Sequence, residues 1–503
     1  MDKLPDDIII HIYLFLPITD RNELSILNKF LRKNIFYCNL NYIKSFDYYS
    51  DTSFRNKVNS LINNSMTQLS LHNVSANYLN LEILNNVNRL YLNNSNLSIL
   101  PKFNNINILD LCNCQNLYDV SILGNLNIHT LNLNCCNNIY DVNSLSKIHK
   151  LSLAFCNIED VSKLGNVYDL CLFSCKKIID FSNLKNNHIL DLSYTNICDI
   201  NGFEKINKLI LVGCNKVKDI NNKLNNTVKL NLSECSGLDN ILIPPKVKEL
   251  NLSSIYNINN INNIFKLNDS KVFNNIYRLI LRNTDLNDSH LVILKNIHTL
   301  DISICNKIYN PNSLENVKIL NLSHCENIKN IDKLYNIKIL NLSNCRSLCD
   351  ISVFSNLDTL NLSKTFIKDV SIFSNLYSLD LSDCKNVNDV SSLGKLHILN
   401  LSNCNIIDVS KLGYVNDLNI SYCKNIKDFC SLTNNHKLNL SYTNISDVSP
   451  LKNIYDLNLS YCTKIKDISI LKNIVKLNLY GCLNIKTELS TLKNVDIRYS
   501  RKI

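Results

Sequence analysis

The fold is decided by a stretch that returns along most of the chain, and one clear copy of it is Ile454-Tyr455-Asp456-Leu457-Asn458-Leu459-Ser460-Tyr461-Cys462. Leu457 and Leu459 alternate with polar residues, a period of two that is typical of a short β-strand with one buried face. The copy continues through Ile465 and Asp467-Ile468-Ser469 to Leu471. We therefore expect a strand in each copy, followed by a turn that leads back to the next strand.

The Leu-x-Leu pair returns every 18 to 22 residues from Leu69 to Val495, which gives 22 units, most of them 19 or 20 residues long. A single unit of this length cannot bury its own leucines. Stacking of successive units would bury them and would align their strands as a parallel sheet. The repeat therefore predicts a solenoid over residues 69–503.

The position five residues after the first strand leucine is Cys or Thr in most units. The chain turns inside the coil here, and a small side chain that hydrogen-bonds buried backbone groups is favoured. Cys112-x-Cys114, Cys135-Cys136 and Cys171-x-x-x-Cys175 could also indicate a metal or redox site. Stacked strands about 4.8 Å apart would place thiols side by side without any such function. We therefore interpret the cysteines as structural and expect no metal site and no cofactor.

A recurring Asp two residues before Ser, as in Asp160, Asp408 and Asp467, could be mistaken for a row of catalytic acids. In a short turn this pattern is better explained by a side-chain hydrogen bond to the backbone. Its repetition in nearly every unit also argues against a single active site.

The units resemble leucine-rich repeats, and most closely the cysteine-containing subclass of that family. The resemblance implies an α/β fold, a curved horseshoe with the parallel sheet on its concave face. These units are shorter than the usual family unit, so we expect irregular or 3₁₀ segments on the convex side in place of full helices.

Two features break the regularity. Residues 131–224 resemble residues 379–472 at a constant offset of 248, which indicates block duplication. The unit between Leu250 and Leu279 runs 29 residues and contains Asn259-Asn260-Ile261-Asn262-Asn263. It predicts a protruding loop of about nine extra residues, either a functional loop or an asparagine-rich slippage insert.

Residues 1–40 follow a different, helical period. Leu4-Pro5-Asp6-Asp7 opens a first amphipathic helix that ends before Pro17. Asp20-x-x-Glu23 resembles a capping box before a second helix. Two short helices with this much apolar surface need a partner, either the end of the solenoid or another protein.

This helical module resembles the F-box, which docks on a Skp-type adaptor in cullin-based ubiquitin ligases. Arg21, Asn22, Asn28 and Leu31 depart from the usual F-box residues, which bears on adaptor affinity. The alternative is that the helical pair only caps the first repeat, with residues 41–68 as linker and cap. The resemblance implies these adaptor-binding residues: Leu4, Pro5, Ile8, Ile9, Ile12, Leu16, Leu24, Leu27 and Leu31.

Composition limits the other function classes. The chain holds no apolar run of 18 residues and does not begin with an apolar signal core, so we expect no membrane association. Its 21 cysteines are odd in number, and most of them occupy one position of the repeat, which favours reduced thiols in a cytoplasmic or nuclear protein. The net charge of +10 comes from scattered Lys and Arg, which favours a solvated surface over nucleic-acid binding. The bias towards Asn, Ile, Lys and Tyr resembles coding in a very AT-rich genome.

Tyr422, Tyr442 and Tyr461 occupy equivalent positions in three successive units, and Tyr480 lies one position earlier in the next. Stacked at strand spacing, they would form an aromatic ridge, and tyrosine is a favoured anchor at protein interfaces. Tyrosine-rich coding of duplicated repeats would produce the same pattern. We list the ridge as a candidate target-binding site.

Together these patterns predict a non-catalytic subunit of a ubiquitin ligase: residues 4–31 dock the adaptor, and the repeats hold a target protein of unknown identity. The alternative is an interaction scaffold with no link to ubiquitin. A ligase with its own catalytic cysteine is not expected, because the repeats run to Ile497 and leave only residues 498–503.

Overall fold

The structure is a computed structural model of the chain. It describes residues 36–39, 66–70, 87–100, 103, 105–238, 241–255, 258–329, 331–334, 336–348, 351, 357–486 and 496–498. The chain forms two compact units, Met1–Val247 and Lys248–Ile503, which are considered separately below.

Among its described residues the first unit contains ten parallel strands, and each pairs with the next one along the chain. Leucine pairs with leucine in the register of the short strands, as Leu131 with Leu151. The strands are β1 (Phe36–Asn39), β2 (Met66–Ser70), β3 (Arg89–Tyr91), β4 (Ile108–Asp110), β5 (Thr130–Asn132), β6 (Lys150–Ser152), β7 (Asp169–Cys171), β8 (Ile189–Asp191), β9 (Lys208–Ile210) and β10 (Lys229–Asn231).

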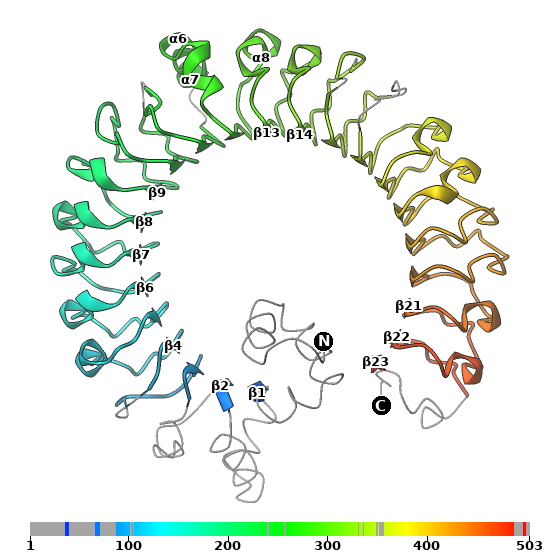
Figure 1. The fold of residues 1–503 in the computed structure, drawn as a ribbon, viewed down its shortest axis with the longest axis horizontal. Helices are drawn as coiled ribbons and strands as arrows, with labels where there is room; N and C mark the ends of the chain where they lie inside the picture. The colour runs from blue at the N-terminus through cyan, green and yellow to red at the C-terminus, as the bar shows by residue number, and fades with distance from the viewer. Residues whose placement is uncertain are drawn as a thin grey trace, which may run out of the picture. The chain divides into compact units, whose positions relative to one another are not determined.

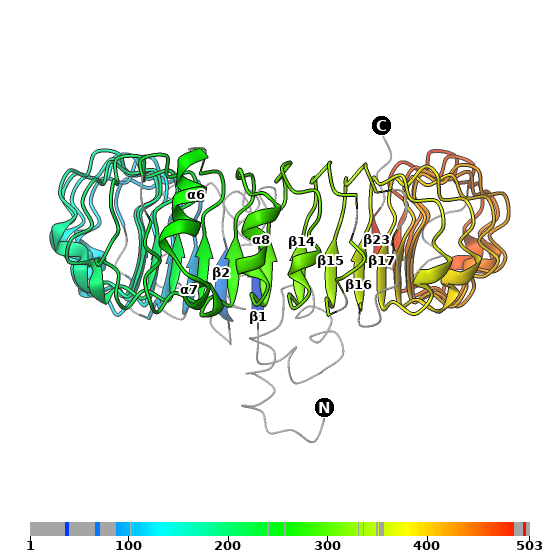
Figure 2. The same ribbon diagram turned by 90° about the horizontal axis from the view of Figure 1, so that it is seen from above.

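The second unit has the same internal arrangement, with thirteen parallel strands in the part that the structure describes. Figure 2 shows β14, β15 and β16 running side by side in one direction. The strands are β11 (Glu249–Asn251), β12 (Arg278–Ile280), β13 (Thr299–Asp301), β14 (Ile319–Asn321), β15 (Ile339–Asn341), β16 (Thr359–Asn361), β17 (Ser378–Asp380), β18 (Ile398–Asn400), β19 (Asp417–Asn419), β20 (Lys437–Asn439), β21 (Asp456–Asn458), β22 (Lys476–Asn478) and β23 (Asp496–Arg498).

These strands confirm the parallel sheet predicted from the Leu-x-Leu pairs. Two details differ from the prediction. Strand β1 lies inside the segment assigned to the helical module. In the last strand it is Ile497 that pairs with Leu477, two residues beyond the predicted Val495. Val495 and Ile497 both fit a period of two, so a shift of two residues leaves the same face buried and cannot be read from alternation alone.

The opposite side of each unit is built from 3₁₀ turns, as predicted from the short repeats. In Figure 1 the strands of each unit line the inner side of its curve, and the turns lie outside. The turns are η3 (Ser121–Asn125), η4 (Asn143–Lys147), η5 (Leu164–Asn166), η6 (Ser182–Asn186), η7 (Phe203–Lys205), η8 (Asn312–Leu314), η9 (Ser371–Phe373), η10 (Ser391–Lys395), η11 (Ser449–Leu451) and η12 (Ser469–Leu471).

The long repeat after Leu250 is the exception, and the protruding loop predicted there is wrong. The extra residues form α6 (Ile258–Leu267) and α7 (Ser270–Asn274), and the next repeat contains α8 (Asp288–Leu294). Ile261, Ile264 and Phe265 are buried at helical spacing, and the Phe265 ring stacks on Phe273 at 5.1 Å. The insertion forms helices because this apolar face packs on the core. The many asparagines between the apolar residues hid the helical spacing in the sequence.

The core of each unit consists of columns of leucine, isoleucine and valine contributed by successive repeats. Both leucines of each pair are buried, for example Leu457 and Leu459. No described helix is long and apolar enough to cross a bilayer.

Candidate functional site: the aromatic ridge of the second unit

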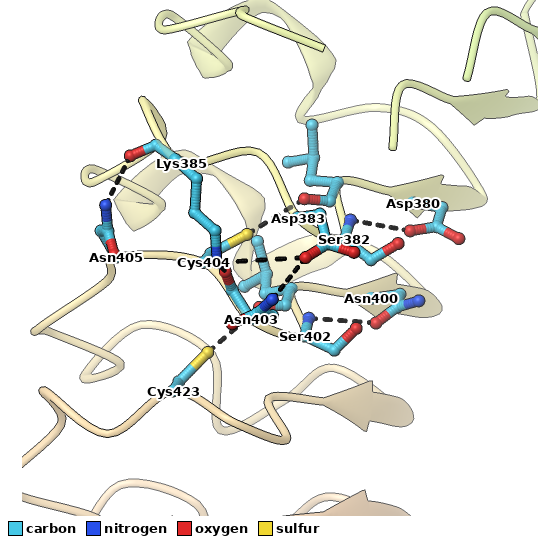
Figure 3. Close-up of polar contacts among 12 residues, drawn as sticks. Asp380, Ser382, Asp383, Lys385, Asn400, Ser402, Asn403, Cys404, Asn405 and Cys423 are labelled. Atoms are coloured by element: carbon cyan, nitrogen blue, oxygen red, sulfur yellow. Dashed lines mark hydrogen bonds and ion pairs between the residues drawn. The ribbon is translucent and has the colours of Figure 1, made fainter. Parts of the chain in front are cut away.

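Most strands present the same polar pattern on their outward face. The residue after the first strand leucine is usually Asn or Asp, and its side chain accepts a hydrogen bond from the backbone two residues later. Figure 3 shows this for Asp380 with the Ser382 N–H at 2.8 Å and for Asn400 with the Ser402 N–H at 3.1 Å. These side chains therefore close the turn that follows each strand.

The cysteines five residues after the first strand leucine, which we call the ladder cysteines, link neighbouring repeats inside the coil. Each thiol donates to the carbonyl of the second strand leucine in the preceding repeat, as Cys404 to Leu381 at 3.0 Å and Cys423 to Leu401 at 3.1 Å (Figure 3). Burial raises the pKa of Cys423 to about 11 and that of Cys345 to about 12. A thiol with so high a pKa is a poor nucleophile at neutral pH.

No group of His, Cys, Asp or Glu among the described residues is arranged to hold a metal ion.

The recurring aspartates of the turns lie on the surface, where each accepts a backbone hydrogen bond. The Ser410 N–H donates to Asp408 at 2.8 Å, and the Ser469 N–H to Asp467 at 2.9 Å. This donation holds the pKa of the Asp408 carboxyl below its usual range. The carboxylates are thus hydrogen-bonded within the turns. A general acid at neutral pH requires a raised pKa, whereas the pKa of Asp408 is lowered.

The four predicted tyrosines lie together where strands β19 to β22 end, and we call Tyr422, Tyr442, Tyr461 and Tyr480 the tyrosine ridge. The rings of Tyr422 and Tyr442 stack at 4.3 Å and 10°, and those of Tyr442 and Tyr461 at 4.4 Å and 15°. Tyr480 meets Tyr461 edge-on at 5.4 Å and 64°. Tyr422 and Tyr480 remain nearly half exposed, at 46% and 47%.

The first three ridge residues adopt a backbone conformation that bulky residues avoid. Their φ angles are 62°, 57° and 59°, in the left-handed region. The same conformation recurs at this turn position in nearly every described repeat, with side chains as different as Asn403, Ile304 and Lys364. It therefore belongs to the turn of the repeat, and what distinguishes the ridge is the tyrosine that three successive turns carry.

The stack determines what the ridge can present to a ligand. Ring faces inside the stack are covered by each other, so the ridge offers ring edges and hydroxyl groups. Burial between its neighbours, together with hydrogen bonds to Tyr422 and Tyr461, raises the pKa of Tyr442 to about 12. The Tyr442 phenol is therefore neutral at physiological pH.

A second set of stacked rings, which the sequence-based reasoning missed, lies at the opposite edge of the sheet, where the strands begin. In the first unit His149 stacks on Tyr168 at 4.5 Å, and Tyr168 stacks on His188 at 4.6 Å. In the second unit His436 stacks on Tyr455 at 4.6 Å. The signal was present as a His or Tyr two residues before many first strand leucines. It becomes meaningful only once the strand register is known.

The adaptor-binding residues predicted within residues 4–31 lie outside the described residues, as does most of the predicted linker, residues 41–68.

Comparisons with known proteins support the fold. No family model matches the chain, and no curated protein does. Among solved structures, the mouse RP105/MD-1 complex matches with a TM-score of 0.58 and 21% identity, over 82% of this chain and 90% of that chain. The TLR13–ssRNA13 complex matches with a TM-score of 0.50 and 17% identity, over 82% and 78%. Both neighbours are leucine-rich-repeat proteins, and the chain is accordingly a leucine-rich-repeat solenoid.

Proposed function

We propose that this chain is the substrate-recognition subunit of a cullin-type ubiquitin ligase and that it holds its target protein on the tyrosine ridge. Residues 4–31 would dock a Skp-type adaptor, and other subunits would transfer ubiquitin. The chain itself performs no chemistry in this proposal.

The observation that carries target binding is the partly exposed stack of Tyr422, Tyr442 and Tyr461. Three successive repeats place tyrosine at the same turn position, and the rings stack at 4.3 Å and 4.4 Å into one continuous aromatic surface. Tyrosine supplies a large contact area at low entropic cost and is enriched in the energetically important centres of interfaces.

The chemistry of the ridge favours a protein over a nucleic acid. One structural neighbour is a complex with single-stranded RNA. Proteins that bind single strands without sequence preference stack bases on free aromatic faces. In this ridge the rings of Tyr422, Tyr442 and Tyr461 cover one another, so internal faces are not available to bases.

A reducing compartment, cytoplasmic or nuclear, fits the same proposal. Every cysteine side chain that the structure describes is a free thiol, and most are buried in the ladder. Disulfides would be the expected state of many neighbouring thiols in an oxidising compartment.

Photo-crosslinking tests the ridge. We expect a chain with p-benzoylphenylalanine in place of Tyr461 to form a protein adduct in cells. The matched control places the same group at Tyr414, which is 80% exposed but lies outside the stack. Identical adducts from both positions, or none from position 461, would overturn the ridge as a binding site.

Reconstitution tests the adaptor. The intact chain should co-elute with a purified Skp-type adaptor, and charged residues in place of Leu4, Pro5 and Ile8 should abolish co-elution. If the intact chain does not bind the adaptor, the scaffold without a ubiquitin link becomes the function.

A further inference from the structure

The first unit carries a surface of different character on strands β6 to β9. On these strands and in the turns that directly follow them, four large apolar side chains stand where the duplicated block of the second unit has Asn or Ser, and two more stand where it has Lys437 and Tyr442. We call this surface the apolar patch, and it consists of Phe155, Phe173, Ile189, Tyr194, Ile210 and Val212.

The apolar patch is continuous across neighbouring strands. The rings of Phe155 and Phe173 lie 5.1 Å apart, and those of Phe173 and Tyr194 lie 5.3 Å apart. The Tyr194 N–H donates to the Val212 carbonyl at 2.7 Å, so Val212 is the next neighbour, with Ile210 two residues before it on the same face. Phe155 is 51% exposed, so about half of this large apolar side chain remains in contact with water, which is unfavourable.

The tyrosine at the end of the ring series is fixed in position. Its hydroxyl donates to Glu234 at 2.7 Å, and its ring lies over Gly213, where an added Cβ would come within 2.5 Å of the ring. The Asp191 carboxylate, which lies among the apolar residues, accepts hydrogen bonds from the Ser193 N–H and hydroxyl. The Tyr194 hydroxyl and the Asp191 carboxylate therefore already have hydrogen-bond partners within the protein.

Lysines border the apolar patch along the edge where the strands begin. Three lysines begin strands β6, β9 and β10, and three more lie at the ends of the 3₁₀ turns that precede β6, β8 and β9. The acidic residues of the same stretches are Asp169, which pairs with Lys150 at 2.9 Å, and Glu204. The lysines are Lys147, Lys150, Lys185, Lys205, Lys208 and Lys229. A ligand that covers the apolar side chains therefore meets a positive edge, and carboxylates on the ligand would complement it.

The block duplication shows that the scaffold does not require these residues. The buried Asn187 and its counterpart Asn435, 248 residues later, make the same contacts, each donating to two carbonyls of the preceding turn. The exposed residues differ: Phe155 corresponds to Asn403, and Phe173 to Ser421. Both copies fold in the same way, so the aromatic residues serve something other than the fold.

We propose that the apolar patch is a second interaction surface, which binds an acidic amphipathic segment of a partner protein. The apolar side chains of the segment would cover Phe155, Phe173 and Val212, and its carboxylates would lie along the lysine edge. This surface is independent of the tyrosine ridge and of the adaptor.

Selection from a random peptide library displayed on phage tests the proposal with the intact chain as bait. Enriched peptides should combine several large apolar residues with Asp or Glu. Phe155→Ser with Phe173→Ser should weaken binding of a selected peptide by roughly tenfold or more, as expected for loss of central aromatic contacts. Lys205→Glu with Lys208→Glu should weaken it as well, and the weakening should shrink at high salt.

The control is Tyr442→Ser, which changes the tyrosine ridge and should leave peptide binding intact. Unchanged circular dichroism and unfolding midpoints verify that each variant folds. The proposal is overturned if no peptide family is enriched, if the enriched peptides are basic or uncharged, or if the double Phe variant keeps full affinity. Binding of a single-stranded RNA probe that the Lys reversals abolish, and the Phe changes do not, would overturn it in favour of nucleic acid.

Discussion

At the scale of the residue, each ladder cysteine connects its own repeat to the preceding one through a hydrogen bond. Their thiols donate a further hydrogen bond to carbonyl groups at the point where the chain leaves the strand, as Cys462 does to Leu440 at 3.0 Å. The Leu440 carbonyl also accepts from the Thr443 N–H at 3.2 Å and from the Thr443 hydroxyl at 2.7 Å, so the thiol adds to this turn a hydrogen bond worth about 0.5–1.5 kcal/mol.

Thiol labelling of the native chain should separate two classes of cysteine. Cys198 and Cys430 are exposed and should react with iodoacetamide, whereas buried Cys156, Cys325 and Cys404 should react only after unfolding. Peptide mass spectrometry before and after denaturation measures this. Rapid labelling of Cys325 in the folded chain would contradict the ladder.

The same thiols should make stability fall in alkaline solution. An unfolded cysteine ionises near its ordinary pKa of 9.0, whereas burial raises the pKa of Cys156 in the fold to about 12. Between these values the folded state binds more protons than the unfolded state, so the free energy of unfolding decreases as pH rises. Urea unfolding at about pH 8 and about pH 10 measures the decrease. It should be smaller in Cys156→Ala, and an equal decrease in both chains would refute the assignment.

At the scale of the element, a 3₁₀ turn packs directly against the turn of the next repeat where it contains a glycine, because glycine has no Cβ between the two backbones. A Cβ on Gly413 would lie 2.1 Å from the Ser431 carbonyl oxygen, and one on Gly165, its duplicate, 2.1 Å from that of Asn183. The obstacle is backbone of the neighbouring turn, which cannot move away as the end of a flexible side chain could.

Gly413→Ala should therefore destabilise the second unit by about 1–3 kcal/mol, as overpacking does. Lys411→Ala in the same turn is the matched control, and its exposed side chain predicts a change within about 0.5 kcal/mol. Urea unfolding compares the two. Equal midpoints would mean that the turns are not packed as described.

The elements show what can and cannot be predicted from this sequence. The strands and the tyrosine ridge follow from a period of two repeated every 20 residues, because burial enforces that period. Helix α6 was mistaken for a loop because asparagines occupy much of its length, although Ile261, Ile264 and Phe265 carry the helical spacing. The apolar patch joins Phe155, Phe173 and Val212, residues about 20 apart, and only the strand register makes them neighbours.

At the scale of the whole molecule, each unit keeps its buried columns and varies its outward residues. The duplicated blocks carry a polar surface bordered by tyrosines in one copy and an apolar surface bordered by lysines in the other. Repeat proteins can vary in this way because each repeat depends for stability only on its neighbours.

We propose that the chain joins two partners, an adaptor at residues 4–31 and a target at the tyrosine ridge. Proximity labelling in cells tests both at once, with the natural chain, a chain with charged residues at Leu4, Pro5 and Ile8, and a chain with Ser at Tyr422, Tyr442 and Tyr461. The first variant should lose the adaptor and cullin while it keeps the target, and the second should lose the target while it keeps the adaptor and cullin. Partner lists that match the natural chain for both variants would contradict the account.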